Sequence, residues 1–521
     1  MTAATRVRGP AAWRGLAGIL SEPSERGFAL RFAILVVALL VVPWAISTLD
    51  LPGPARYLVS ASAALIIAVA YWRWPVEALL ALAMFVAFYD STESHIPHIK
   101  QVDELSIAFL APLALIRAWR DWRAWTWWPR EAALGLFVLA ALVSTVVAGV
   151  SLGTALPGLV LVTKAIVFFY VVLVTPFPAW AIGGALRVGL AIGLGVMLLG
   201  LIEYLDPRAF QTTFGLPEYV RSRGEGAVVK SLFAHPALFG FFTTFVALFT
   251  FAQYQVTRRW RWLAAGLFMS LGPFFAARRR AILALLGSLL VGFLESLRRV
   301  RAPRKVARTW LPVLAGLVIV GALFFAGLQN LYARTVTGYF ERPVTGEVGS
   351  GGSPFIGDSE NPQARLALYT GSMWIALDRF PLGGGLGRYG TWMSREHYSG
   401  LYQQYNLDEV RGLRAGRASA ATDTFWPAIL GESGVIGLLG YLGYFGSLAF
   451  ILWREAGRDD GPLLRVLRIG AGMIFAQAIV ESLASSMFHS PPRVYLFYLA
   501  VGAVAAIAWR RRAAEPDRET A

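Results

Sequence analysis

The sequence contains no cysteine, and only five of its 521 residues are histidine. The absence of cysteine excludes disulfide bonds, thiol nucleophiles, cysteine-ligated zinc and iron–sulfur clusters. Charged residues are also scarce, since they make up 15% of the chain, whereas a typical soluble domain has about 25%. These shortages argue against thiol and redox chemistry and against a chain of ordinary soluble domains.

Apolar residues are abundant, at 56% of the chain, and they occur in long uninterrupted runs. A helix needs about 20 mostly apolar residues to cross a bilayer, and we find about fourteen segments near that length. Runs such as "FAILVVALLVVPWAI" lack the alternation of transmembrane strands. The predicted spans are residues 28–49, 56–72, 75–89, 105–120, 131–149, 157–175, 180–205, 232–255, 262–277, 281–297, 310–329, 424–453, 467–488 and 493–509.

The predicted fold class is therefore all-α, a polytopic transmembrane bundle of about 12 to 14 spans with a large, mainly helical loop late in the chain. The expected parts, in chain order, are a tail over 1–31, a bundle of about 11 spans over 32–329, a cap loop over 330–423, further transmembrane helices over 424–509 and a tail over 510–521.

The formal net charge of +16 is explained mainly by topology. Most lysines and arginines of the short loops fall on alternate connections, together with both tails, and such loops are cytoplasmic. We therefore expect both termini in the cytoplasm and the cap loop outside it, and we do not expect a nucleic-acid partner. Loops as long as 330–423 usually carry function, so the cap suggests an extracytoplasmic substrate.

A minority of the basic residues lies on the predicted outer side of the membrane, where the topology rule expects few of them. Arg278, Arg279 and Arg280 separate two apolar runs at the predicted outer boundary, and guanidinium groups match phosphate oxygens bidentately. A membrane-embedded pyrophosphate is thus a suitable ligand. The alternative is that the preceding span crosses only halfway and the cluster is cytoplasmic. Three further basic residues lie in an outer segment, namely Arg221, Arg223 and Lys230. They either form a basic rim at the outer interface together with the three arginines or belong to a solvated loop.

Lys164 falls inside the predicted span 157–175. An ionisable group at such depth is costly and indicates function, although snorkelling to the interface also explains it. Two acids, Glu432 inside the span that follows the cap and Glu481 near the outer end of a span, are candidate salt-bridge partners for these cations.

Three blocks resemble the O-antigen ligase and O-antigen polymerase (WaaL and Wzy-like) superfamily. "ARRRAILAL" at 277–285 is similar to the family's "SRGALLAL" element, with Arg279 at the motif arginine. "RLALYTGSMWIALDRFPLGGGLGRYG" at 365–390 is similar to the arginine, helix and glycine-rich element of its periplasmic loop. "DTFWPAILGESGVIG" at 423–437 is similar to the start of the next span, and "SLFAHPALFG" is a weaker match in which Ala237 replaces the usual Asn.

The resemblance implies a GT-C-like glycosyltransferase of the bacterial inner membrane with its active site on the periplasmic side. Its donor would be an undecaprenyl-pyrophosphate-linked glycan, and its acceptor a sugar hydroxyl of a second glycan. Asp423 stands where the ligases tend to have a histidine. This departure favours an O-antigen or exopolysaccharide polymerase over a ligase that transfers polymer to lipid A core.

The chemistry requires cations for the leaving pyrophosphate and a general base for the acceptor hydroxyl. We assign pyrophosphate binding to Arg279, with Arg278 or Arg280, Arg221 or Arg223, and Arg365, and we count Lys230 and Lys164 among the substrate-binding candidates. A carboxylate beside arginines stays ionised, so Asp423 is the candidate base, with His397 and Glu432 in reserve. Alternatively, Asp423 only caps the following helix. Direct attack would be metal-independent and would invert the anomeric carbon.

Trp392 and Tyr402 in the cap are candidates for sugar binding, although cap packing also explains them. No cofactor or metal is expected, and the one acidic pair that suits a metal in the loop is Asp358 and Glu360. A lipid or polysaccharide transporter remains a second class, and a glycosyltransferase with its acidic site at Asp50 a third. The bilayer is an expected partner, and binding of a chain-length regulator is left open.

Overall fold

A computed structural model shows an all-α polytopic membrane protein. It describes residues 21–49, 53–93, 95–99, 101–120, 129–215, 222–223, 226–299, 303–327, 362–456 and 461–514. Within these residues, ten helices are long and apolar enough to cross a membrane, and Tyr57–Arg73 and Pro75–Tyr89 are shorter apolar helices. The predicted fold class is confirmed.

Each predicted span coincides with helical structure. The helices of the bundle are α2 (Glu25–Ser47), α3 (Tyr57–Arg73), α4 (Pro75–Glu93), α5 (Val102–Arg120), α6 (Pro129–Val147), α7 (Leu152–Leu173), α8 (Ala179–Leu205), α10 (Pro236–Thr257), α11 (Trp260–Met269), α12 (Gly272–Phe275), α13 (Arg279–Arg299), α14 (Pro303–Gly327), α19 (Trp426–Ala456), α20 (Pro462–Ser482) and α21 (Arg493–Ala514). The ninth predicted span is broken into α11 and α12. α12 begins at Gly272 with Pro273 in its first turn, and a proline lacks the N–H that a continuous helix needs.

Four shorter elements connect the bundle helices. They are η1 (Gly53–Arg56), α9 (Pro207–Thr213) and the antiparallel two-residue strands β1 (Ser222–Arg223) and β2 (Gly226–Ala227). One apolar core extends through the bundle and includes Phe169, Phe242, Tyr441 and Phe497.

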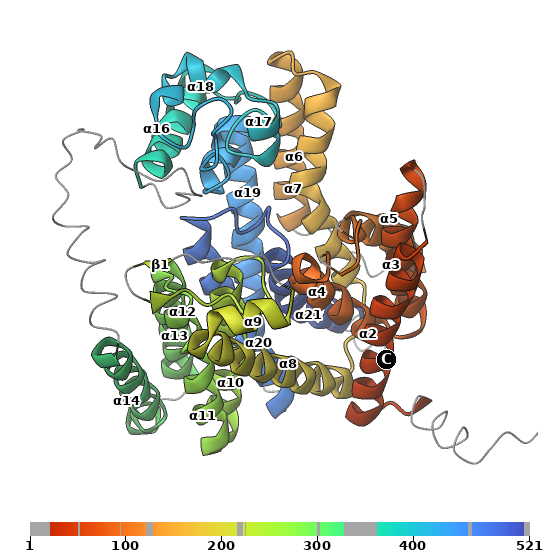
Figure 1. The fold of residues 1–521 in the computed structure, drawn as a ribbon, viewed down its shortest axis with the longest axis vertical. Coiled ribbons are helices and arrows are strands. Elements are labelled where there is room, and N and C mark those ends of the chain that lie inside the picture. The colour runs from red at the N-terminus through yellow and green to blue at the C-terminus, as the bar shows by residue number, and fades with distance from the viewer. Residues whose placement is uncertain are drawn as a thin grey trace, which may run out of the picture.

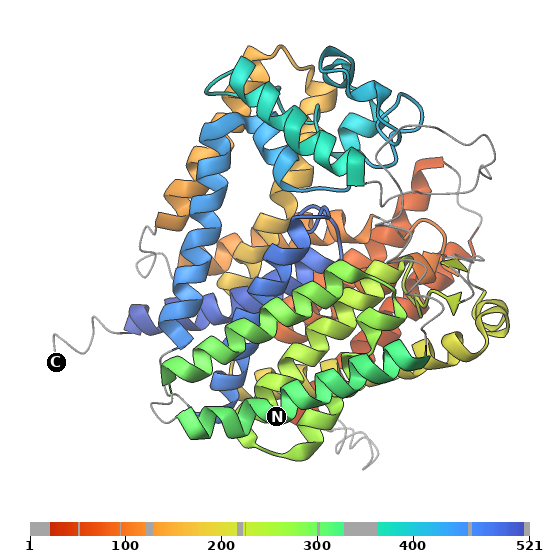
Figure 2. The same ribbon diagram turned by 90° about the vertical axis from the view of Figure 1, so that its left-hand side faces the viewer.

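The cap lies at one end of the bundle, where α6, α7 and α19 rise to meet it (Figure 1). Figure 2 shows α19 and α6 side by side below it. The cap contains α16 (Pro362–Asp378), α17 (Trp392–Glu396), α18 (Gly400–Gln404) and η3 (Leu407–Glu409). Its own small core includes Leu368, Ile375, Tyr389 and Leu413. We call this end of the bundle the cap end.

The glycine-rich segment "PLGGGLG" fixes the cap to the bundle by close backbone contacts. Gly383 N–H donates to Ser144 Oγ at 2.8 Å, and Gly384 N–H donates to the Gly431 carbonyl at 2.7 Å. A Cβ on Gly383 would lie 2.6 Å from the Glu432 carbonyl carbon, which is inside van der Waals contact. Only a residue without a side chain allows this approach, so the glycines serve docking of the cap.

Candidate functional site

Arg365 and Asp423 meet where the cap joins the bundle. Arg365 belongs to the first turns of α16, and its Nη2 lies 3.3 Å from Asp423 Oδ2. Their side chains are 21% and 14% exposed, so the pair is largely shielded from water but accessible. Asp423 does not cap α19, because the Phe425 carbonyl accepts the first helical hydrogen bond, from Ala428 N–H. Its carboxylate instead pairs with Arg365 across the junction of cap and bundle.

Arg280 enters the same site from the start of α13. Its Nη1 donates a hydrogen bond of 2.6 Å to the Ala484 carbonyl, just beyond the end of α20. The guanidinium is close enough to Arg365 and Asp423 to interact electrostatically with both. A cation from the membrane helices thus reaches the pair at the cap junction.

Arg493, the first residue of α21, adds another cation. Its Nη1 lies 3.8 Å from Glu481 Oε2, and the two side chains are only 8% and 1% exposed. Nε and Nη1 of Arg493 have no hydrogen-bond partner in the part of the chain that the structure describes. Arg493 also interacts electrostatically with Asp423 and Arg278. Buried guanidinium N–H groups of this kind favour an anionic ligand, because unsatisfied buried donors are costly.

Arg278 completes the site through His235. His235 Nδ1 accepts a hydrogen bond of 3.1 Å from Ala237 N–H and so caps α10, while His235 Nε2 lies 3.2 Å from Arg278 Nη2. This contact attaches the Arg278 guanidinium to the start of α10.

The charge of this site is positive. We call it the arginine cluster, and it consists of Arg278, Arg280, Arg365 and Arg493 with Asp423 and Glu481. Four guanidinium groups against two carboxylates leave a formal excess of two positive charges. The helices α10, α13, α19 and α21 all begin beside it, and helix N-termini carry partial positive charge that favours anions.

The other predicted phosphate ligands lie elsewhere or are not described. Arg279 begins α13 and is half-buried. Arg223 is the last residue of β1, and Arg221 lies outside the described residues. Lys230 is buried, and its backbone N–H donates to Glu203 Oε2 at 2.9 Å. Burial lowers the pKa of the Lys230 side chain, and Glu203 opposes that shift.

Lys164 is held in a separate group of charges. Its Nζ lies 2.9 Å from Asp103 Oδ2 and also pairs with Glu104, both in the first turn of α5. Tyr495 O–H donates to the same Asp103 oxygen at 3.2 Å. These contacts tie α5, α7 and α21 together, so the depth of Lys164 is explained by an internal ion pair.

Glu432 serves the attachment of the cap. Its Oε1 accepts hydrogen bonds from Tyr389 N–H at 3.0 Å and from Thr391 Oγ1 at 3.1 Å. The side chain is 2% exposed. Of the two buried acids considered as partners of cations, Glu481 pairs with Arg493 and Glu432 with the cap backbone.

The candidate cap residues differ in access. Tyr402 is fully buried, and its hydroxyl accepts from Gly390 N–H at 3.0 Å; burial raises the pKa of Tyr402 to about 12. Tyr402 therefore belongs to the cap core. Trp392 is 52% exposed and offers an open face to a sugar ring. His397 is exposed at the end of α17.

Among the described residues, no group of three or more His, Asp or Glu side chains could hold a metal ion. Asp358 and Glu360, the predicted acidic pair, and Asp50 lie outside the described residues. Sequence reasoning grouped Arg279, with Arg278 or Arg280, together with Arg365 and Asp423, whereas the structure brings Arg278, Arg280, Arg365 and Asp423 into one cluster. Sequence reasoning did not single out Arg493 or His235 for this site. The only signal at Arg493 is a lone arginine directly before an apolar span.

The chain matches no model of a known protein family and no curated protein.

Proposed function

We propose that this protein is a membrane glycosyltransferase that extends a polysaccharide from an undecaprenyl-pyrophosphate-linked glycan. The observation that carries the proposal is the arginine cluster, where the starts of α13 and α21 and the cap bring four guanidinium groups around one accessible carboxylate. A pyrophosphate attached to a lipid needs such a site at the boundary between the bundle and a domain outside it.

The arginines would bind the pyrophosphate and stabilise the charge that develops on it. Arg280, Arg365 and Arg493 come from three different elements, so the binding geometry is fixed by the packing of the fold. Preorganised cations of this kind stabilise a leaving group without reorganising during the reaction. Their donors match phosphate oxygens in pairs.

Asp423 would act as the general base. The acceptor hydroxyl oxygen attacks the anomeric carbon of the donor sugar, its proton passes to Asp423, and the bond from that carbon to the pyrophosphate oxygen breaks with its electron pair. The products are the lengthened glycan and undecaprenyl pyrophosphate, and the anomeric configuration inverts. Arg365, 3.3 Å from Asp423, joins the base to the pyrophosphate site.

Polymerase and ligase share this chemistry and differ in the acceptor. The resemblance supports the polymerase, because Asp423 replaces the histidine that ligases tend to have at this position. A deletion strain separates the two by the gel profile of its surface glycan. Single repeat units would support the polymerase, whereas full-length polymer retained on undecaprenyl pyrophosphate would favour the ligase. An unchanged glycan together with lost solute uptake would contradict both.

The direct test uses purified protein in lipid nanodiscs with lipid-linked oligosaccharide as both donor and acceptor. We expect lengthened lipid-linked product that persists in EDTA, with release of undecaprenyl pyrophosphate in equal amount. Failure to lengthen any lipid-linked glycan, with the protein folded and the substrate intact, would overturn the proposal.

A further inference from the structure

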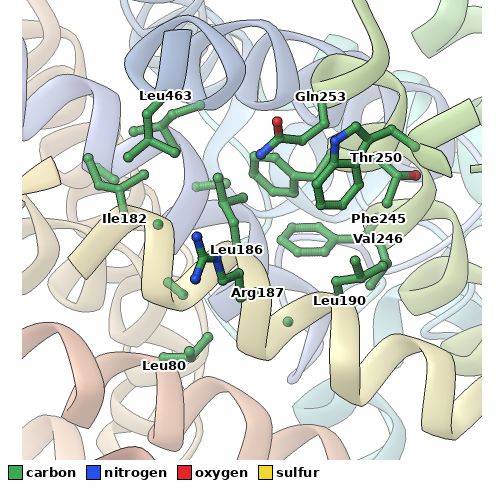
Figure 3. Close-up of a pocket in the computed structure, with 18 of the residues that line it drawn as sticks. Leu80, Ile182, Leu186, Arg187, Leu190, Phe245, Val246, Thr250, Gln253 and Leu463 are labelled. Carbon is green, nitrogen blue, oxygen red and sulfur yellow. The ribbon is translucent and has the colours of Figure 1, made fainter. Parts of the chain in front are cut away.

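A second site lies at the end of the bundle opposite the cap. A cavity of about 790 Å³ opens between α4, α8, α10, α20 and α21. Its walls are mainly apolar and include Leu80, Leu190, Phe245, Val246 and Leu463 (Figure 3). The volume falls in the range typical of small-molecule sites.

This cavity is distant from the arginine cluster. His235, which caps the N-terminus of α10, lies 3.2 Å from Arg278 of the cluster, whereas Thr250, Gln253 and Thr257 in the last turns of α10 line the cavity. At 1.5 Å per residue, the start of α10 and Gln253 are about 25 Å apart. The two sites therefore act on different parts of a ligand or on different ligands.

The rim of the cavity is basic. Arg187, Arg259 and Arg261 line it together with one acid, Glu25. Arg187 projects from α8 toward the cavity in Figure 3 and pairs with Glu25 at 2.5 Å. After that pair is formed, two arginine charges at the start of α11 remain in excess among the lining residues.

Tryptophans mark the same rim as a membrane interface. Trp260 is 78% exposed, and the Arg261 guanidinium lies over Trp262, at 5.2 Å from the ring centroid. Tryptophan is enriched where a protein meets lipid headgroups. A ligand that suits this site has an apolar chain, for the cavity, and an anionic head, for the two arginines.

We propose that this cavity binds an anionic phospholipid, with an acyl chain between α8 and α10 and its phosphate on Arg259 and Arg261. The charge excess selects an anionic over a zwitterionic headgroup, because each arginine near the headgroups attracts negative lipid. The site does not depend on the glycosyltransferase proposal, since it uses none of the residues of the arginine cluster.

Native mass spectrometry of the full-length protein, titrated with phosphatidylglycerol and with phosphatidylcholine of the same acyl chains, tests this site. We expect phosphatidylglycerol to bind at least about tenfold more tightly. The double substitution Arg259→Gln/Arg261→Gln should reduce that preference to about threefold or less. Gly189→Leu should weaken both lipids, because a Cβ at Gly189 meets no atom within 4 Å and a larger side chain would fill the cavity.

The matched control is Arg304→Gln/Arg308→Gln, which removes the same charge from exposed positions on α14 outside the cavity. It should leave the preference unchanged. Equal binding of the two lipids, an equal loss of preference in the control, or stronger competition by undecaprenyl phosphate than by phosphatidylglycerol would each overturn the proposal. In the last case the cavity would hold the lipid carrier instead.

Discussion

Arg365 Nη2 lies 3.3 Å from Asp423 Oδ2, which joins the first turns of the cap helix α16 to the segment that enters α19. This pair connects the cap to the bundle at the point where the arginines of α13 and α21 converge. Docking of the cap therefore completes the positive site, so the position of the cap and the affinity for an anion should be coupled.

Substitution Asp423→Asn keeps the size of the side chain but removes its capacity to accept a proton. We expect elongation of lipid-linked glycan to fall by about 10²- to 10⁴-fold, while binding of the lipid pyrophosphate is retained. Turnover and donor affinity measured separately in nanodiscs check this. Glu396→Gln, at an exposed acid of α17, is the control and should have near-normal turnover. An Asp423→Asn enzyme with full turnover would exclude Asp423 as the base.

Arg280 and Arg279 are adjacent but should differ in importance. Arg280 contacts the Ala484 carbonyl and lies near Arg365 and Asp423, whereas the motif resemblance assigns the key role to Arg279. We expect Arg280→Gln and Arg493→Gln to weaken binding of the lipid pyrophosphate by about tenfold or more, the value of a lost charge-assisted hydrogen bond. Arg279→Gln should weaken binding of the lipid pyrophosphate by less than about threefold. Equilibrium binding of undecaprenyl pyrophosphate to the three variants measures these losses. A larger loss in Arg279→Gln than in Arg280→Gln would return the main role to Arg279, as the motif predicts.

The helices were predictable because apolar runs in a membrane protein have almost no alternative to helical structure. The arginine cluster was predictable only in part. Arg278 and Arg280 stand out against the topology rule, but Arg493 and His235 join them through packing that no local pattern encodes. For the same reason, the sequence pattern suggested Glu432 or Glu481 as salt-bridge partners of the cations, whereas Lys164 pairs with Asp103, 61 residues away.

Glu432 should control the attachment of the cap more than the chemistry. Glu432→Ala leaves Tyr389 N–H and the Thr391 hydroxyl without their acceptor, which should cost about 3 kcal/mol in cap docking. Hydrogen exchange should then accelerate over residues 383–402. Glu409→Gln, at an exposed acid of the cap, should leave exchange unchanged. Unaltered protection in Glu432→Ala would show that the glycine contacts alone hold the cap.

His489, in the connection between α20 and α21, should make stability depend on pH. Burial, and secondarily the positive charge of Lys164, lowers the pKa of His489 from 6.5 to about 3. Because the unfolded state then binds more protons below pH 6.5, this contribution is fully present above that pH and is lost as the pH falls toward 3.

At pH 5 the loss should be about 2 kcal/mol relative to pH 7.5. His489→Asn should remove this component, so the melting temperature of the variant should fall less than that of the wild type over the same interval. Parallel declines of the two proteins would show that other groups cause the acid sensitivity.

Lys164 should prove to be a structural residue. Its Nζ pairs with Asp103 and Glu104 inside the bundle, and removing one partner of a buried ion pair leaves an uncompensated charge that costs about 3 to 5 kcal/mol. Lys164→Met should therefore lower the melting temperature strongly. The triple variant Lys164→Met/Asp103→Asn/Glu104→Gln, which removes all three charges together, should recover most of the loss.

A transporter that uses Lys164 to bind its cargo predicts the opposite pattern, in which both variants stay stable and lose uptake. Thermal unfolding of the single and triple variants, with glycan elongation measured in parallel, distinguishes the structural role from the transporter role. If the ion pair only joins α5 to α7, elongation activity should recover in the triple variant together with its stability.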